Sequence, residues 1–209
     1  SQPRLYPEGV GRLLPKGADL VMQIHYHPDG VAREDQSTVA IYLHRQPVKR
    51  RVATIPLVNR EIDIPAGVKD YERTARLTLP IDTTIIGLMP HMHLLGREMI
   101  VSAEKPDGTL VPLLHIDDWD FRWQDLYRLA EPLTLPRGTT LLLKARYDNS
   151  SENPDNPNNP PQRVRWGEQT TDEMCLCAIE YVADSQADIR TIRRALLLQR
   201  LVDRLEEDD

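Results

Sequence analysis

Cysteine, phenylalanine and long apolar runs are scarce in this chain. Its 209 residues include two cysteines and one phenylalanine, and no stretch approaches the roughly 18 consecutive apolar residues that a membrane-spanning helix needs. Cys175 and Cys177 stand two positions apart, a spacing too constrained for an easy disulfide and different from a CxxC motif. A disulfide framework is therefore excluded, and no membrane insertion is expected.

Basic residues are outnumbered as well. The 26 Lys and Arg stand against 32 Asp and Glu, and residues 206–209 supply four of the six excess negative charges. Because a nucleic-acid-binding surface needs a basic excess, no nucleic-acid partner is expected. The chain opens without a charged-then-apolar leader, in a loop-like stretch that we expect to belong to a longer protein.

Short apolar segments rich in β-branched residues recur, separated by Pro, Gly, Asp and Asn. With 17 prolines, 10 glycines and no helical period before residue 185, the pattern predicts a mainly β protein, an antiparallel jelly-roll-like β-sandwich. The expected strands are residues 18–27, 37–45, 75–81, 83–89, 98–105, 109–116, 139–147 and 173–182. The run 149–161, rich in Asn and Pro, is expected to be a surface loop.

Three further patterns bear on packing. Trp119, Phe121 and Trp123 alternate, which favours core positions over the lining of a cleft. Residues 14–27 and 135–148 share a Leu-Pro-basic-Gly start, which suggests two related sandwiches. From Ser185 onward, apolar residues recur at spacings of three and four, and these predict one amphipathic helix capped by Ser185 and Asp188 that packs on the sandwich or on a second copy of the chain. The apolar positions are Ile189, Ile192, Leu196, Leu198, Leu201, Val202 and Leu205.

Four of the six histidines form two His-x-His pairs, His25 with His27 and His91 with His93. Alternate side chains of a strand share one face, close enough for two imidazoles to bind one ion. A cupin site would add a glutamate, for which Glu98 is well spaced, and a final histidine, which both Pro-x-Gly-x-x segments lack. A zinc hydrolase would need a third histidine or a carboxylate with a general base, and no such spacing stands out.

A third option uses a thioether, a soft ligand that favours Cu(I), and Met174 begins an expected strand. "TTDEMCLCAIEYV" resembles the Asp-Glu-Met-Cys segment of the copper type II, ascorbate-dependent monooxygenases, and "PHMHLLGRE" resembles their His-x-His-x-Leu-Gly segment. "LVMQIHYH" is similar to the strand that closes their first domain. The three segments occur in the family's order, between about residues 14 and 183.

The resemblance implies that His91, His93 and Met174 bind the substrate-side copper, where dioxygen hydroxylates a C–H bond. It implies that His25 is one ligand of an electron-transfer copper, and His27 is an extra histidine that would join it in a second, incomplete site. The implied domains are residues 1–45, the closing strands of a first sandwich; residues 46–184, the catalytic-type sandwich; and residues 185–209, the helix and acidic tail. A periplasmic or extracellular location is implied too.

The chain departs from the family at three places. It has no His-His pair before residue 14, no cysteine in "LLLKARYD" to pair with Cys175, and no recognisable arginine to hold a peptide carboxylate. We therefore expect a copper-dependent monooxygenase domain whose second copper site is incomplete in this chain. Its expected partners are dioxygen, an electron donor such as ascorbate, a small organic substrate, and an upstream domain or a second copy bound through the helix. The alternatives are a copper-binding or copper-sensing module without turnover, and a structural sandwich.

Overall fold

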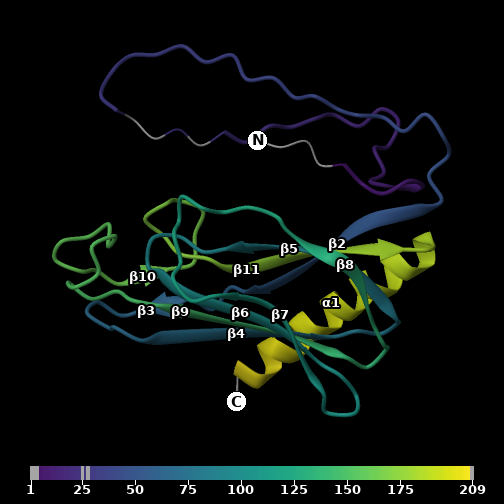
Figure 1. Cartoon of the computed structure of the whole chain (residues 1–209). Coiled ribbons are helices and arrows are strands. Elements are labelled where there is room, and N and C mark those ends of the chain that lie inside the picture. The colour runs from purple at the N-terminus through teal and green to yellow at the C-terminus, as the bar shows by residue number, and fades with distance from the viewer. Residues whose placement is uncertain (1–4, 25, 27–28, 208–209) are drawn as a thin grey trace.

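Two β-sheets and one helix make up the body of the protein (Figure 1). The computed structural model describes residues 5–24, 26 and 29–207, with side chains as far as residue 202. The sheets are built almost entirely from antiparallel pairs, and the helix ends the chain. The prediction of a mainly β, antiparallel fold with a C-terminal helix is confirmed.

One sheet has five strands in the order β1-β2-β11-β5-β8, and the other has four in the order β4-β9-β6-β7. The first sheet comprises β1 (Val10–Gly11), β2 (Arg50–Asn59), β11 (Cys175–Ala183), β5 (Thr83–His91) and β8 (Tyr127–Leu135). The second comprises β4 (Tyr71–Thr78), β9 (Thr140–Tyr147), β6 (Gly96–Glu104) and β7 (Leu110–Ile116). A small pair joins β3 (Asp63–Ile64) to β10 (Val164–Arg165).

The core lies between the two sheets, because the apolar side chains of each strand alternate toward it. In β11 every second residue is buried, and β9 shows the same alternation from Leu141 to Tyr147. Both cysteines belong to this core, as free and fully buried thiols. Burial raises the pKa of Cys175 to about 11 and that of Cys177 to about 12, so both remain protonated.

Strands β2 and β8 were absent from the sequence-based prediction, and each of them contains a proline. Proline cannot donate to a ladder, so it is tolerated where a strand has an open edge. Pro132 lies in β8, the edge strand of its sheet. Pro56 lies in β2, whose outer side pairs with β1 only at Arg50 and Arg51.

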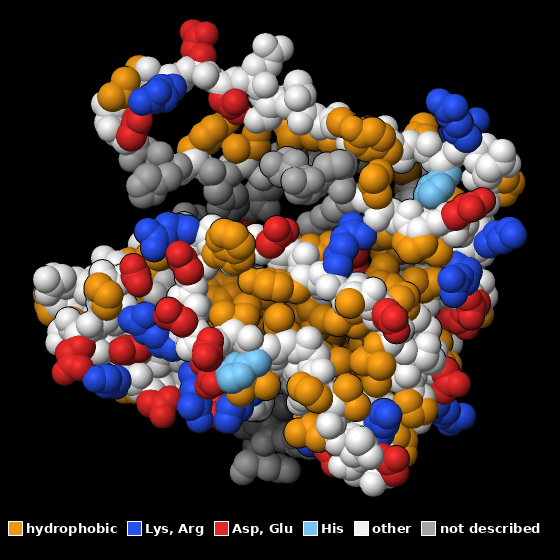
Figure 2. Space-filling model, in the orientation of Figure 1, with side chains coloured by type: hydrophobic (Ala, Val, Ile, Leu, Met, Phe, Trp, Pro, Cys, Tyr) orange, Lys and Arg blue, Asp and Glu red, His pale blue; other side chains and the backbone are white. Residues whose placement is uncertain are grey.

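The N-terminal segment, residues 12–49, forms no strand among its described residues. The strands expected at 18–27 and 37–45 are therefore not found there, and their alternating apolar side chains are exposed along the chain, as at Val21, Ile41 and Leu43. Figure 1 shows this segment crossing above the five-stranded sheet, and Figure 2 shows apolar side chains both on it and on the body beneath. Arg12 fixes its start by an ion pair of 2.8 Å with buried Glu180 of β11.

Helix α1 (Gln186–Glu207) begins where the sequence predicted. Asp188 Oδ2 accepts from the Ser185 backbone N–H at 2.8 Å, and Ser185 Oγ accepts from the Asp188 N–H at 3.2 Å, which is the reciprocal pattern of a capping box. Ile189 and Ile192 are buried, and the helix contacts β2, β4 and β11. Among the described residues, no helix combines the length and apolar character that crossing a membrane requires.

Candidate metal centre

His91, His93 and Met174 meet because two neighbouring strands of the five-stranded sheet run antiparallel. His91 ends β5 and lies opposite Leu176 of β11. The same register carried two residues further sets Met174, just before β11, opposite His93. The two imidazole rings are 5.1 Å apart between centroids and nearly perpendicular, at 84°.

These three side chains line one cavity of about 290 Å³. Its wall also takes residues from the loop between β7 and β8, from the loop before β11 and from the N-terminal segment. The full lining is Gln23, His91, His93, Phe121, Gln124, Glu168, Thr170 and Met174. The cavity therefore lies at the end of the five-stranded sheet and is closed by residues from three segments outside the strands, an arrangement suited to binding a ligand on a fixed scaffold.

The hydrogen bonds of the histidines fix their tautomers. His93 Nδ1 lies 3.0 Å from the Asp172 carbonyl oxygen, which can only accept, so Nδ1 carries the proton. His91 Nδ1 contacts Gln124 Oε1, and Gln124 donates its Nε2–H to the Phe121 carbonyl at 2.7 Å, which orients its oxygen toward His91. When each ring is neutral, the lone pair then belongs to Nε2, the form in which histidine binds metals.

The protonation state of His93 also suits a metal ligand. His93 is 4% exposed, and this burial lowers its pKa below the ordinary value of 6.5. His91 adds a smaller effect in the same direction, while the backbone of Asp172 opposes it. His93 is therefore neutral at neutral pH, and a metal ion would meet little competition from protons.

Glu173 ties the two ligand-bearing segments together from behind. Its side chain is fully buried, and its Oε1 accepts from the backbone N–H of His93 and, at 2.8 Å, of Met174. Its Oε2 accepts from the Leu95 N–H at 3.0 Å. Burial raises the pKa of Glu173 to about 8, and the three N–H donors act in the opposite direction. One side chain thus holds the segment that follows β5 and the residue that precedes β11 at a fixed separation.

Two aromatic side chains brace the same segments. Trp119 donates its indole N–H to the His93 carbonyl at 3.1 Å, and Tyr147 of the other sheet donates its hydroxyl to the Met174 carbonyl at 2.9 Å. Gly96 is needed beside Trp119, because a Cβ atom there would lie 2.9 Å from Trp119 Cδ1 and 3.0 Å from Met92 Cβ. Met92 lies between the two histidines in the sequence and is fully buried, so this close packing constrains the backbone that carries them.

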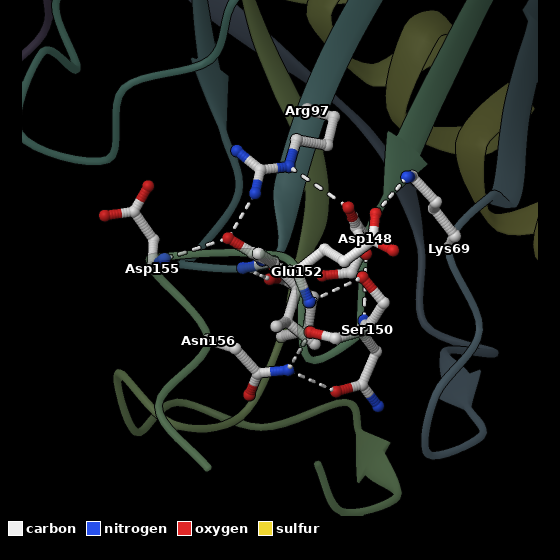
Figure 3. Close-up of polar contacts among 11 residues, drawn as sticks. Lys69, Arg97, Asp148, Ser150, Glu152, Asp155 and Asn156 are labelled. Carbon is white, nitrogen blue, oxygen red and sulfur yellow. Dashed lines mark hydrogen bonds and ion pairs between the residues drawn. The ribbon is translucent and has the colours of Figure 1, made fainter. Parts of the chain in front are cut away.

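The loop after β9 supports the turn that follows His93. The Asp148 N–H donates to the Leu95 carbonyl at 2.8 Å, and Arg97 pairs with Asp148 at 4.0 Å and donates to the Asn153 side chain. Asn153 donates to the Asp148 carbonyl at 2.7 Å. Figure 3 shows this network, in which Asn156 also binds the Ser150 carbonyl. Residues 149–161 form a loop, as predicted, but one anchored by buried amides.

The donor set at the cavity fits copper better than zinc. Within the part of the chain that the structure describes, no three His, Cys, Asp or Glu side chains gather as a metal site. A metal held here would therefore take the Met174 thioether as its third protein ligand, and two imidazoles with a thioether favour Cu(I). Cupin-type ligation is not formed, since Glu98 pairs instead with His115 at 2.9 Å on the four-stranded sheet.

The other predicted site residues have different outcomes. His25 and His27 lie outside the described residues, so the second copper site stays a prediction, although nearby Gln23 lines the cavity. The core prediction for the aromatic cluster holds for Trp119, which is 5% exposed. It is wrong for Phe121, whose ring stands 6.0 Å from His93 in the cavity wall, and for Trp123, which is 71% exposed. All three residues lie in the loop between β7 and β8, where alternate side chains do not share one face as they do on a strand.

Several site residues escaped the sequence reasoning. Gln124 lies 33 positions from His91, and nothing in its neighbourhood signals the contact. Glu168 and Thr170 come from a loop that carries no metal-ligand spacing. Glu173 offered a signal, since an acidic residue next to a candidate ligand in a strand that is otherwise apolar needs a buried partner.

Comparison with protein families shows the class to which this fold belongs. Residues 53–192 match the copper type II ascorbate-dependent monooxygenase, C-terminal domain. The chain belongs to this family. The match covers β2 through the first turns of α1 and includes all three residues of the candidate centre.

Two relatives are similar over long stretches. The chain is 24% identical to mouse DBH-like monooxygenase protein 1 over 199 residues, which is 84% of this chain and 30% of the mouse protein. It is 25% identical to the human protein of the same name over 130 residues, or 56% of this chain and 20% of the human protein. The chain thus spans less than a third of the length of these relatives.

Proposed function

We propose that this chain is the copper-binding catalytic domain of a monooxygenase, which hydroxylates a C–H bond of a small organic substrate with dioxygen and a reductant such as ascorbate. The observation that carries the proposal is the convergence of His91, His93 and Met174 on one cavity, with the Nδ1 atom of each imidazole engaged. Membership in the copper monooxygenase family supports it.

The chain's own residues have separate roles in this proposal. His91 and His93 would hold copper through Nε2, and the soft Met174 thioether would favour the reduced ion. Copper would supply the activation of dioxygen, which an amino-acid side chain cannot provide. Gln124, Asp172 and Glu173 keep the ligands oriented, since partners of this kind commonly tune ligand geometry and metal affinity.

The cavity wall restricts the substrate. Phe121 offers an apolar surface, and Gln124 and Thr170 offer hydrogen-bonding groups beside the ligands. Among the described residues of this wall there is no Lys or Arg, so none of them would pair with a substrate carboxylate. A small organic molecule is therefore favoured over the carboxyl end of a peptide.

Electron supply is the second requirement of the reaction. His25 and His27 are proposed as part of a second copper site, on the same segment that brings Gln23 to the cavity. An oxidising location, periplasmic or extracellular, accords with the family resemblance. Preceding sequence that supplies further histidines would complete that site.

Copper affinity and dioxygen uptake test the proposal together. We expect the wild-type chain to bind copper at this centre, and Met174→Ala to weaken Cu(I) binding more than Cu(II) binding, because the lost ligand is soft. Ascorbate-dependent dioxygen uptake by the protein joined to its preceding sequence should disappear in the same variant. His115→Ala is the matched control, since His115 is 55% exposed at its side chain and lies on the other sheet.

A copper-binding module without turnover is the second candidate. It requires only the three ligands that line the cavity, His91, His93 and Met174. Stoichiometric copper that depends on His91 and Met174, with no dioxygen uptake when preceding sequence is present, would select it. Copper retention equal in wild type, Met174→Ala and His91→Ala would reject both candidates.

A further inference from the structure

Helix α1 carries more apolar surface than the sandwich covers. Residues 195–202 read Ala-Leu-Leu-Leu-Gln-Arg-Leu-Val, so six of eight are apolar. Ile192 faces the body and is buried, whereas Leu201, nine residues or two and a half turns later, points to the opposite side and is 55% exposed. Leu197 and Leu198 are 61% and 53% exposed. A helix that is apolar on both sides is normally covered on both.

From this second face we infer that α1 pairs with α1 of a second copy of the chain, in an antiparallel arrangement centred on Leu197, Leu198, Leu201 and Val202. Leu198, Leu201 and Leu205 follow one another at spacings of three and four, the repeat with which two helices interlock their side chains. The pairing is independent of the proposed activity, because it uses the side of α1 turned away from the sandwich.

Charge decides the direction of the pair. The first part of α1 is basic, with Arg190, Arg193 and Arg194 exposed, and none of the three forms an ion pair within the described part of the chain. The sequence from residue 203 is acidic, ending Glu-Glu-Asp-Asp. An antiparallel pair sets the basic part of each helix beside the acidic end of the other, whereas a parallel pair would set like charges together.

A second copy is the occupant that the helix itself favours. It brings an identical leucine surface and the complementary charge in one step. Figure 1 shows the C-terminal end of α1 on the side of the molecule away from the described N-terminal segment, so that segment does not cover it.

The mass of the 209-residue protein in solution tests this inference, measured by light scattering after size-exclusion chromatography. We expect twice the 24.0 kDa mass of one chain at low ionic strength, with dissociation as salt is added. Leu198→Glu/Leu201→Glu should give the single-chain mass with unchanged far-UV circular dichroism, because both leucines are exposed in the single chain. Leu110→Glu, also exposed but on β7, is the control and should keep the double mass.

Charge reversal tests the direction and avoids the apolar face. Arg193→Glu/Arg194→Glu alone, and Glu206→Lys/Glu207→Lys alone, should each give single chains, and an equimolar mixture should restore the double mass. In a parallel pair the first variant would associate as the wild type does, which would overturn the antiparallel arrangement. A wild type that stays at the single-chain mass, or that associates only with lipid vesicles or with preceding sequence, would overturn the pairing itself.

Discussion

Tyr147→Phe isolates the contact through which one sheet positions a ligand on the other. Tyr147 ends β9 and is 0% exposed, and its hydroxyl donates to the Met174 carbonyl at 2.9 Å across the sandwich. Phenylalanine fills the same space, so the substitution removes the hydroxyl without opening a cavity. Burial raises the pKa of Tyr147 well above 10, so the donor is present across the working pH range.

The expected cost follows from that single hydrogen bond. A net contribution of about 0.5–1.5 kcal/mol is usual, and leaving a buried acceptor without its partner costs about 1–3 kcal/mol. Because the Met174 side of the contact is only partly buried, we expect the free energy of unfolding to fall by about 1–2 kcal/mol. In a chain of this size that corresponds to a Tm lower by roughly 3–6 °C.

Copper binding should respond as well. Two hydrogen bonds fix the backbone of Met174, one from Tyr147 and one to Glu173, and the variant removes the first. We expect Cu(I) affinity to fall by up to about tenfold, the equivalent of 1.4 kcal/mol, and less than in Met174→Ala. The contacts of both imidazoles stay intact, so copper should still bind.

Urea unfolding at 25 °C and competition with a Cu(I) chelator measure the two effects. Tyr42→Phe is the matched control, since Tyr42 is 70% exposed, and it should change neither quantity. Equal unfolding free energies for Tyr147→Phe and wild type would refute the reasoning about stability. A lower stability with unchanged Cu(I) affinity would instead show that the backbone of Met174 does not set the position of its thioether.

Two further predictions concern the residues behind the site. In the copper-free protein, burial raises the pKa of Glu173 to about 8 from an ordinary 4.5. Between about pH 4.5 and 8 the unfolded chain has lost the Glu173 proton while the folded chain keeps it, so the free energy of unfolding of the wild type should fall as pH rises through this range. Glu173→Gln has no carboxyl group to titrate, so its free energy of unfolding should depend less on pH. Parallel pH curves for the two proteins would contradict the raised pKa of Glu173. Gly96→Ala adds a Cβ 2.9 Å from Trp119 Cδ1, and such overpacking should cost about 1–3 kcal/mol in urea unfolding and weaken copper binding through Met92. An alanine variant as stable as wild type would show that Trp119 and Met92 move aside without cost.

The sequence predicts those parts of the fold that depend on local alternation. Strands with a clear period of two, such as β5, β9 and β11, appear where they were expected, and the cap at Ser185 fixes the start of α1. Strands β2 and β8 were not predicted, and their prolines, Pro56 and Pro132, are tolerated because they lie at open sheet edges, which depend on which strands are neighbours. Sheet order is a tertiary property, and no local pattern encodes it.

In the candidate centre, too, local contacts could be predicted from the sequence and long-range contacts could not. His91 and His93 share a local motif, so their proximity could be predicted from spacing alone. Met174 lies 81 positions from His93 in the sequence, and only the family resemblance linked the two. Gln124 and Glu173 act through contacts over 33 and 80 positions, which spacing rules do not reach.

The N-terminal segment bears on both halves of the proposed function, copper binding and electron supply. Its first residue, Arg12, donates to Glu180 of the five-stranded sheet at 2.8 Å. Tyr6, which precedes the segment, donates its hydroxyl to the same carboxylate at 3.2 Å. From there the segment brings Gln23 to the cavity that His91, His93 and Met174 line. The proposed ligands therefore belong to the sandwich, whereas His25 and His27, proposed for electron supply, belong by sequence to the N-terminal segment. Copper binding can therefore be tested apart from turnover, through variants of His91, His93 and Met174 that leave the N-terminal segment unchanged.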